Sequence, residues 1–133
     1  MTPVSGRGWI TASGRSTDDA GWYVINRSRV AAAPGNVVPE GAYYLGRPWR
    51  TFARVVFQRS TLSKVINPAG WAVWNVGNEQ IDNVFFAEYA NQGPVTNETR
   101  AEFAQQIANP IEIETVLGAG YAGERYVDAK YLK

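Results

Sequence analysis

The sequence predicts an all-β chain built from short strands. Aromatic residues make up 13% of the chain, and they cluster with β-branched residues in short runs. The 13 glycines and seven prolines, together with asparagines, separate many of these runs. Such punctuation is typical of strands joined by turns rather than of a helical bundle.

Each expected strand is a short apolar run that ends near a turn-forming residue. A long loop over 33–41, which carries Pro34 and Pro39, divides the first strands from the rest. The expected strands are 9–12, 22–26 with a continuation at 29–31, 43–45, 53–58, 64–66, 71–74 and 83–89.

Two architectures fit this pattern. Strand starts near positions 9, 22, 54 and 84 do not recur at one period, which suits a solenoid whose coils carry loops of varying length. A β-sandwich also produces short, closely spaced strands. The mostly apolar runs 55–57 and 84–86 favour the solenoid and are expected in the core, because strands of buried parallel sheets rarely alternate cleanly.

One segment is expected to be helical. Thr99 and Glu102 have the spacing of a capping box, in which each side chain satisfies a free amide at the helix start. An apolar stripe then runs to Ala108, and Asn109-Pro110 ends the helix. The tail, residues 111–133, is expected to be irregular and packed back on the body.

Composition narrows the possible chemistry. The 13 Lys and Arg nearly balance the 12 Asp and Glu, so charge gives no reason to expect nucleic acid or a membrane surface as partner. No apolar stretch reaches the roughly 20 residues of a membrane span, and the start lacks a signal-peptide core. The chain has no His and no Cys, which excludes Ser-His-Asp and thiol mechanisms within it. We expect no metal and no cofactor.

The segment 43–50, Tyr-Tyr-Leu-Gly-Arg-Pro-Trp-Arg, carries the most information. Gly46 allows a backbone turn, and Pro48 stiffens the backbone after it. Together they would hold Arg47 and Trp49 in fixed positions. A guanidinium forks onto a carboxylate and an indole offers a flat face to a sugar ring, so the pair suits an acidic carbohydrate. The alternative is an arginine stacked on tryptophan at a loop, with no ligand.

This segment resembles the Leu-Gly-Arg-Pro-Trp signature of the pectin methylesterases, carbohydrate esterases that act on methylated polygalacturonate. Further segments match the family in the same order, with wording similar to its fungal branch. They are Thr-Ala-x-Gly-Arg at 11–15, the strand 53–58, Ile-x-Pro-x-Gly-Trp-x-x-Trp at 66–74, Glu-Tyr-x-Asn-x-Gly at 88–93, and Arg100.

The resemblance implies a right-handed parallel β-helix, a single-stranded solenoid of the pectin-lyase type, ending in a short C-terminal helix and tail. It implies hydrolysis of methyl esters in pectin, outside the cell, by one aspartate as nucleophile and another as general acid and base, with glutamines stabilising the oxyanion. Arg47 takes the role of the arginine that orients the nucleophile. Trp49 and Trp74 become sugar-stacking residues, and methylated pectin is the expected partner.

The family's aspartate motifs precede the Thr-Ala-x-Gly-Arg strand, and only eight residues precede Trp9 here. We therefore expect residues 1–133 to be the C-terminal portion of one pectinesterase domain, with weak or no activity alone. Asp18 and Asp19 are expected in a solvated turn. Exposed strand edges favour self-association.

Two rival functions stay open. One is a non-catalytic, pectin-binding fragment of a β-solenoid. The other is a lyase of pectin, which is disfavoured because no cluster of calcium-binding carboxylates is visible.

Overall fold

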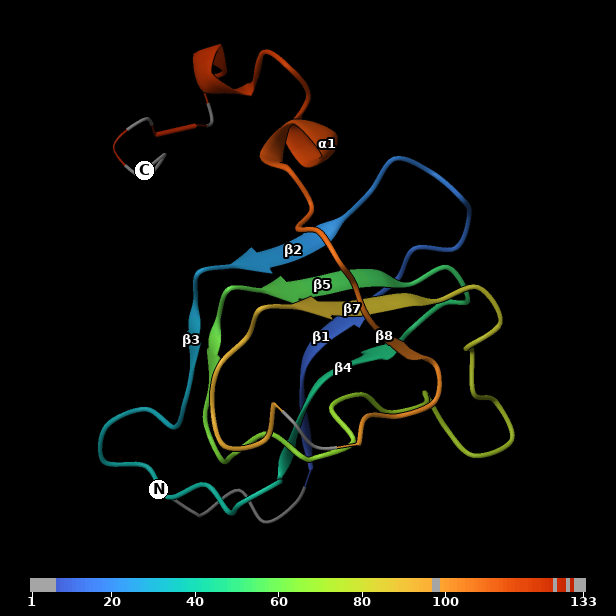
Figure 1. Ribbon diagram of the computed structural model, residues 1–133. Helices are drawn as coiled ribbons and strands as arrows, with labels where there is room; N and C mark the ends of the chain where they lie inside the picture. The colour runs from blue at the N-terminus through green and yellow to red at the C-terminus, as the bar shows by residue number, and fades with distance from the viewer. Residues whose placement is uncertain (1–6, 97–98, 126, 129, 131–133) are drawn as a thin grey trace.

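Short strands account for most of the regular structure in this computed structural model (Figure 1). The structure describes residues 7–96, 99–125, 127–128 and 130. Its elements are β1 (Gly8–Ser13), β2 (Tyr23–Asn26), β3 (Arg29–Val30), β4 (Tyr43–Pro48), β5 (Arg54–Gln58), β6 (Thr61–Leu62), β7 (Phe85–Tyr89), β8 (Ala104–Gln106), α1 (Ile113–Leu117) and the 3-10 helix η1 (Tyr121–Gly123).

The strands form three parallel sheets, ordered β1-β4, β2-β5-β7-β8 and β3-β6. From β1 to β7, strands that follow one another in the chain lie in different sheets, and strands of one sheet pair in parallel with their counterparts in the neighbouring coil. Figure 1 shows β2, β5 and β7 side by side and pointing the same way. The chain is therefore a parallel β-helix, as expected, and the sandwich alternative is wrong, because sandwich sheets are antiparallel.

The core is a file of apolar side chains inside the coils. Val55, Phe57 and Phe86 are fully buried there, whereas Val84 is only partly buried. Trp71 stacks on Phe86 with ring centroids 4.5 Å apart and meets Phe57 edge-on at 5.9 Å. The prediction that the runs 55–57 and 84–86 form the core is thus confirmed for their inward-facing residues.

A charged pair lies beside this aromatic file. The carboxylate of Glu88 accepts bonds from Arg100 Nε at 2.7 Å and Arg100 Nη2 at 3.0 Å. Both side chains are buried, at 7% exposure for Arg100 and 2% for Glu88. The remaining nitrogen, Nη1, donates to the carbonyls of Pro68 and Val95, and Trp71 Nε1 donates to Glu88. Every guanidinium nitrogen therefore has a partner.

Two predicted strands are only single bridges. In the segment 64–66, Ile66 forms an isolated parallel bridge with Tyr43, and in 71–74 Trp71 forms one with Gly46. Turns surround both residues, so the third coil has no continuous strand under β4.

The helix predicted over 99–108 is wrong. This segment contains β8, whose Ala104 pairs with Phe86 of β7, and Ala101 N donates to Ala69 O at 2.9 Å. Phe103 packs on Phe86, with centroids 6.1 Å apart. The local preference for a helix is overridden by tertiary contacts. The segment pairs with the open edge of β7, and this places Arg100 against Glu88.

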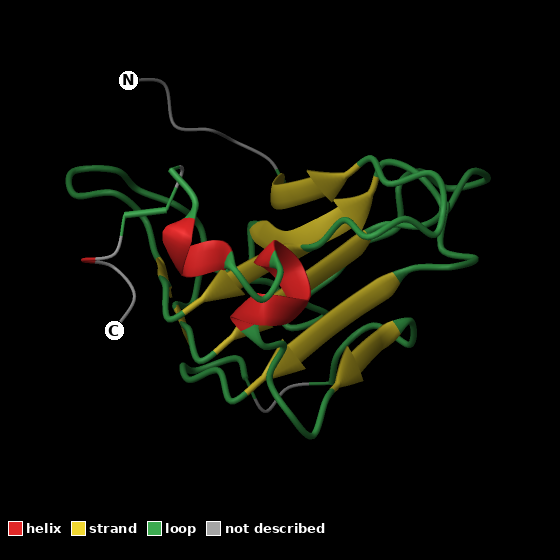
Figure 2. Ribbon diagram, turned by 90° about the horizontal axis from the view of Figure 1, so that it is seen from above, coloured by secondary structure: helices red, strands yellow, loops and turns green. Residues whose placement is uncertain are grey.

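A short helix does occur, but later in the chain, in α1. The amide side chain of Gln58 holds the start of this tail: Nε2 donates to Ile111 O at 3.1 Å, and Oε1 accepts from Ile111 N at 2.8 Å. Figure 1 shows α1 beyond β2, outside the coils, and Figure 2, seen from that side, shows both helices in front of the strands. No helix among the described residues is long and apolar enough to cross a membrane.

Candidate active site

Arg47, the arginine of the central motif, lies between two indole rings. It sits in β4 opposite Ala12 of β1. Its guanidinium carbon is 3.6 Å from the ring centroid of Trp9 and 4.2 Å from that of Trp74. Trp9 in turn stacks on Tyr44 at 6.5 Å. The structure thus places two indoles against Arg47, that of Trp74, which was predicted only to stack on a sugar, and that of Trp9.

The polar contacts of Arg47 are few. Its Nη1 donates to Trp74 O at 3.5 Å, the outer limit of a hydrogen bond. Its Nε is buried and has no partner among the described residues, and the same holds for Trp9 Nε1. In the described part of the chain no carboxylate pairs with this guanidinium. Two faces held by π systems and an edge without an anion leave Arg47 a positioned but unneutralised charge.

Gly46 is needed for close packing rather than for a turn. It lies within β4 and is absent from the glycines with positive φ. A Cβ at this position would stand 2.2 Å from Thr11 Oγ1 and 3.2 Å from Trp71 Cζ3. The expectation of a turn at Gly46 is therefore wrong, and the glycine instead allows Thr11 of β1 and the ring of Trp71 to approach β4 closely.

Trp74 stands at the start of a tight loop. Its amide donates to Glu79 O at 3.1 Å, and Asn75 and Asn78 exchange backbone hydrogen bonds. In the amide orientation that satisfies both of its atoms, the Asn75 side chain accepts from Trp74 Nε1 at 3.2 Å and donates to Trp74 O at 2.9 Å. These bonds fix the Trp74 indole in place, and one face of its ring is covered by the Arg47 guanidinium.

Trp49 takes no part in this stack. It is 47% exposed and packs against Gly14, where a Cβ would stand 2.8 Å from Trp49 Cε3. It lines an open hollow of about 380 Å³ at the end of β1, together with Trp22 and Arg54. Of the three predicted site residues, Trp49 is the one that lines this hollow, and the guanidinium carbon of Arg50 lies 5.1 Å from the centroid of its ring.

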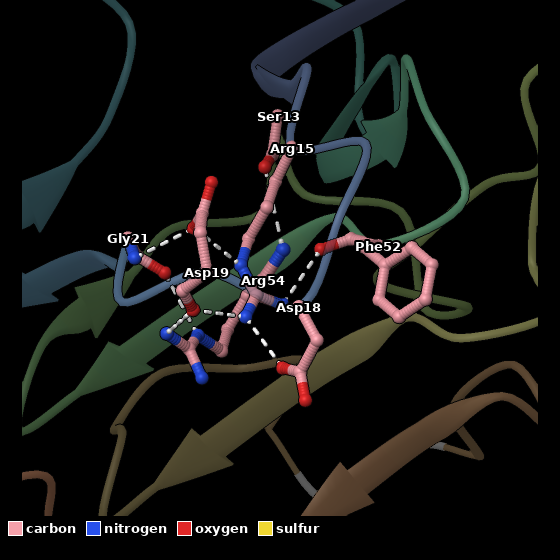
Figure 3. A network of polar contacts seen from close by, with 7 residues as sticks. All are labelled: Ser13, Arg15, Asp18, Asp19, Gly21, Phe52 and Arg54. Atoms are coloured by element: carbon pink, nitrogen blue, oxygen red, sulfur yellow. Dashed lines mark hydrogen bonds and ion pairs between the residues drawn. The ribbon is translucent and has the colours of Figure 1, made fainter.

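A network of polar contacts, shown in Figure 3, includes several of the residues that line this hollow, among them Arg15 and Asp19. Arg15 Nε donates to Asp19 Oδ1 at 2.9 Å, Nη2 to Asp18 Oδ1 at 2.8 Å, and Nη1 to Phe52 O at 3.2 Å. Nη2 also contacts Asp19 O. Asp18 and Asp19 lie in an exposed turn, as expected, and both are engaged by Arg15.

The network shifts the ionisation of its members. The pKa of Asp19 is lowered from its usual 3.8, first by the hydrogen bond from Gly21 N and then by the bond from Arg15. Burial lowers the pKa of Arg15, but the hydrogen bonds to Asp18 and Asp19 outweigh it, so the net shift is upward. Both shifts favour the charged pair and so fix the loop between Gly14 and Gly21.

No group of three or more His, Cys, Asp or Glu in the described ranges could hold a metal ion. Trp9 is the residue of the site that sequence reasoning missed. It was assigned only to a strand, and its place over Arg47 depends on the parallel register that pairs Trp9 with Tyr44.

Known proteins resemble most of this chain. The pectinesterase family model matches residues 2–115. Pectinesterases from Aspergillus aculeatus and Aspergillus niger are 46% and 45% identical over 92% of this chain. The chain spans 37% of the length of each of these relatives.

Solved structures give the same answer. The pectin methylesterase of Aspergillus niger superimposes with a TM-score of 0.80 and 38% identity, over 95% of this chain and 40% of its own. The enzyme from carrot superimposes with a TM-score of 0.69 and 30% identity, over 98% of this chain and 41% of its own. With a matching family model, relatives above 40% identity and a shared β-helix, the chain belongs to the pectinesterase family.

Proposed function

We propose that this chain serves the hydrolysis of methyl esters in the galacturonan of pectin, and that it contributes the arginine of the active site. The observation that carries the proposal is Arg47, a guanidinium held between two indoles with no carboxylate beside it among the described residues. A charge placed in this way binds and orients an incoming carboxylate strongly, because it has no internal anion to give up.

In the mechanism that the family resemblance implies, an aspartate attacks the ester carbonyl and methanol leaves. Water then cleaves the acyl-enzyme and releases a free galacturonate carboxylate. Arg47 pairs with the attacking aspartate and holds it in its ionised form. Trp49 offers its exposed ring to a neighbouring sugar. Trp74 has two roles in this mechanism: it holds the Arg47 guanidinium in position, and it contacts the polysaccharide.

We further propose that residues 1–133 form the C-terminal portion of one pectinesterase domain. The support is the 37% share of the relatives' length that this chain spans. Asp18 and Asp19 are tied to Arg15 rather than to Arg47, so neither is placed to act as the nucleophile. The chain alone is therefore expected to release little or no methanol. Like a pectin-degrading enzyme, it would act outside the cell.

A second candidate function rests on the same lack of a described carboxylate beside Arg47. The chain would then bind pectin without hydrolysing it, through Trp49 and the hollow at the end of β1. Turnover separates the two candidates, because a binding module releases no methanol in any context.

A chimaera tests the first proposal. The segment that precedes the matched region in the Aspergillus niger enzyme is joined to this chain, and methanol release from highly methylated pectin is measured. We expect activity in the chimaera, a loss of at least about a hundredfold with Arg47→Ala, and no loss with Arg59→Ala, an exposed arginine outside the site. A folded but inactive chimaera would favour the binding module.

Self-association is a separate proposal about partners. Among the described residues, β1, β2 and β3 lie at the edges of their sheets, and each pairs with one strand only. Free strand edges recruit further strands, so we expect concentration-dependent oligomers in sedimentation. A monomer that melts cooperatively at all concentrations would contradict this.

A further inference from the structure

The two indoles that lie against Arg47 come from different coils. Trp9 belongs to β1, the coil before Arg47, whereas Trp74 follows Trp71, which forms a bridge with β4 from the coil after it. Trp9 is the nearer of the two, with 3.6 Å between its ring centroid and the guanidinium carbon, against 4.2 Å for Trp74. The orientation of the guanidinium therefore depends on contacts with both neighbouring coils.

Trp9 is itself held firmly at the start of β1. Its ring stacks on Tyr44, the residue with which it pairs, and the two ring planes are 16° apart. The preceding residue, Gly8, donates its amide to Ala42 O at 2.9 Å, and a Cβ on this glycine would collide with the ring of Tyr43. This close packing of β1 on β4 leaves the Trp9 indole a fixed place over Arg47.

Tryptophan at this position has a cost for the fold. Trp9 Nε1 is buried and has no hydrogen-bond partner among the described residues. A buried donor without an acceptor is destabilising, and a phenylalanine could stack on Tyr44 without one. What the indole supplies beyond a phenyl ring is a stronger attraction for a cation. The contact with Arg47 therefore accounts for a tryptophan here.

The clamp also decides which nitrogens of Arg47 can meet an anion. Nε is buried, and Nη1 donates to Trp74 O at 3.5 Å. Nη2 makes no hydrogen bond to a described residue either, but unlike Nε it is not buried. A carboxylate can therefore approach the terminal edge of the guanidinium at Nη2, whereas the side that carries Nε is closed. Without Trp9 the group could turn and present either side.

We propose that Trp9 is a positioning residue for the reaction at Arg47, because it holds the guanidinium with its Nη2 edge toward the attacking carboxylate. The inference rests on the ester hydrolysis proposed above and deepens it. Trp9 acts through Arg47 and has no need to touch the ester. A guanidinium that is free to turn still attracts a carboxylate, but it spends less time in the productive orientation. Loss of Trp9 should therefore lower kcat and leave KM nearly unchanged.

Kinetics of the chimaera with the Aspergillus niger segment test this role, with kcat and KM on highly methylated pectin determined separately. We expect Trp9→Leu to lower kcat about tenfold and to change KM by less than about twofold. Trp9→Phe keeps a ring face over Arg47, so it should retain at least about half of the parent kcat. Tyr89→Leu removes the ring beside another arginine, Arg59, and is the matched control that should change neither constant.

Proton NMR of the chain alone tests the clamp without any activity. Ring currents displace the Nε proton of a guanidinium between two indole faces upfield, and the signal of Arg47 is assigned by its absence from the Arg47→Met spectrum. We expect Trp9→Leu to move this signal toward the ordinary arginine position, and Trp9→Phe to move it less. Circular dichroism melting checks that each variant is folded.

Several results would overturn the inference. An Arg47 signal at the ordinary position in the parent chain would show that the guanidinium is not clamped. A higher KM with unchanged kcat in Trp9→Leu would make Trp9 a sugar contact instead. Equal losses of kcat in Trp9→Leu and Trp9→Phe would show that the ring face over Arg47 has no effect. A folded but inactive parent chimaera would overturn the proposed hydrolysis, and the catalytic role of Trp9 with it, even where the displaced signal establishes the clamp.

Discussion

Two partly buried arginines, Arg47 and Arg100, stand in opposite electrostatic settings. Arg100 has a carboxylate partner in Glu88 and bonds at every nitrogen. Arg47 has two aromatic faces, one long hydrogen bond and a buried Nε without a partner among the described residues. The charge of Arg100 is neutralised within the protein by Glu88. That of Arg47 is left to be satisfied from outside, which is the usual sign of a functional position rather than a stabilising one.

The largest expected effect concerns the completed pair. Replacing Arg100 by Met leaves the carboxylate of Glu88 buried and without its cation, so unfolding should become easier by about 3–5 kcal/mol. Urea denaturation followed by tryptophan fluorescence measures the change.

The double variant Glu88→Leu/Arg100→Met is the control, since it removes both charges. It should recover much of the loss, because an apolar pair carries no desolvation cost. If Arg100→Met alone costs less than about 1 kcal/mol, the contrast between the two arginines does not hold.

A second test removes the other hydrogen bond to the Glu88 carboxylate, which comes from Trp71. Trp71→Phe removes the 3.3 Å bond from Nε1 to the carboxylate and leaves a gap in the aromatic file. We expect a loss of about 2 kcal/mol, less than for Arg100, because the ion pair remains. Trp22→Phe, whose ring lies at the outer surface against Phe85, serves as comparison and should cost less. Equal losses would mean that the bond to Glu88 contributes nothing.

The third prediction concerns stability at Arg47. Replacement by Met keeps a long side chain between the indoles and removes a cation whose Nε has no described partner. The lost cation–π attraction and the relieved desolvation oppose each other, so stability should change by only about 1 kcal/mol. Thermal melting of the purified chain measures it. A loss as large as that for Arg100→Met would show that Arg47 is mainly a structural residue.

The smallest effect on stability is expected for a third arginine, Arg15, because its partners Asp18 and Asp19 are exposed to solvent. Asp19 has a pKa below 3.8, so its contribution to stability is complete above that value and disappears as the pH falls through the lower folded pKa. A carbon-13 titration of the Asp19 carboxyl should give a midpoint below 3.8, and Arg15→Gln should raise it. A midpoint at or above 3.8 in the parent chain would contradict the assignment.

Much of the fold could be read from local patterns. The runs that became β1, β2, β4, β5 and β7 are apolar, short and bounded by turn residues, and these signals survive in any context. The same signals were misleading in the third coil. Ile66 and Trp71 each form a single bridge there, although strands were expected at both positions. The capping-box signal at Thr99 and Glu102 was genuine as a local preference, but the free edge of β7 competed for the same backbone groups.

The amino-acid sequence by itself determined the all-β class and the family, because each can be recognised from short motifs of residues close together in the chain. Only the tertiary structure decided that Trp9 lies over Arg47, that Glu88 faces inward to Arg100, and that Arg54 lies over the ring of Trp22. Most of these contacts join residues on different coils, dozens of positions apart. Such contacts depend on the register between coils, and no short segment encodes that register.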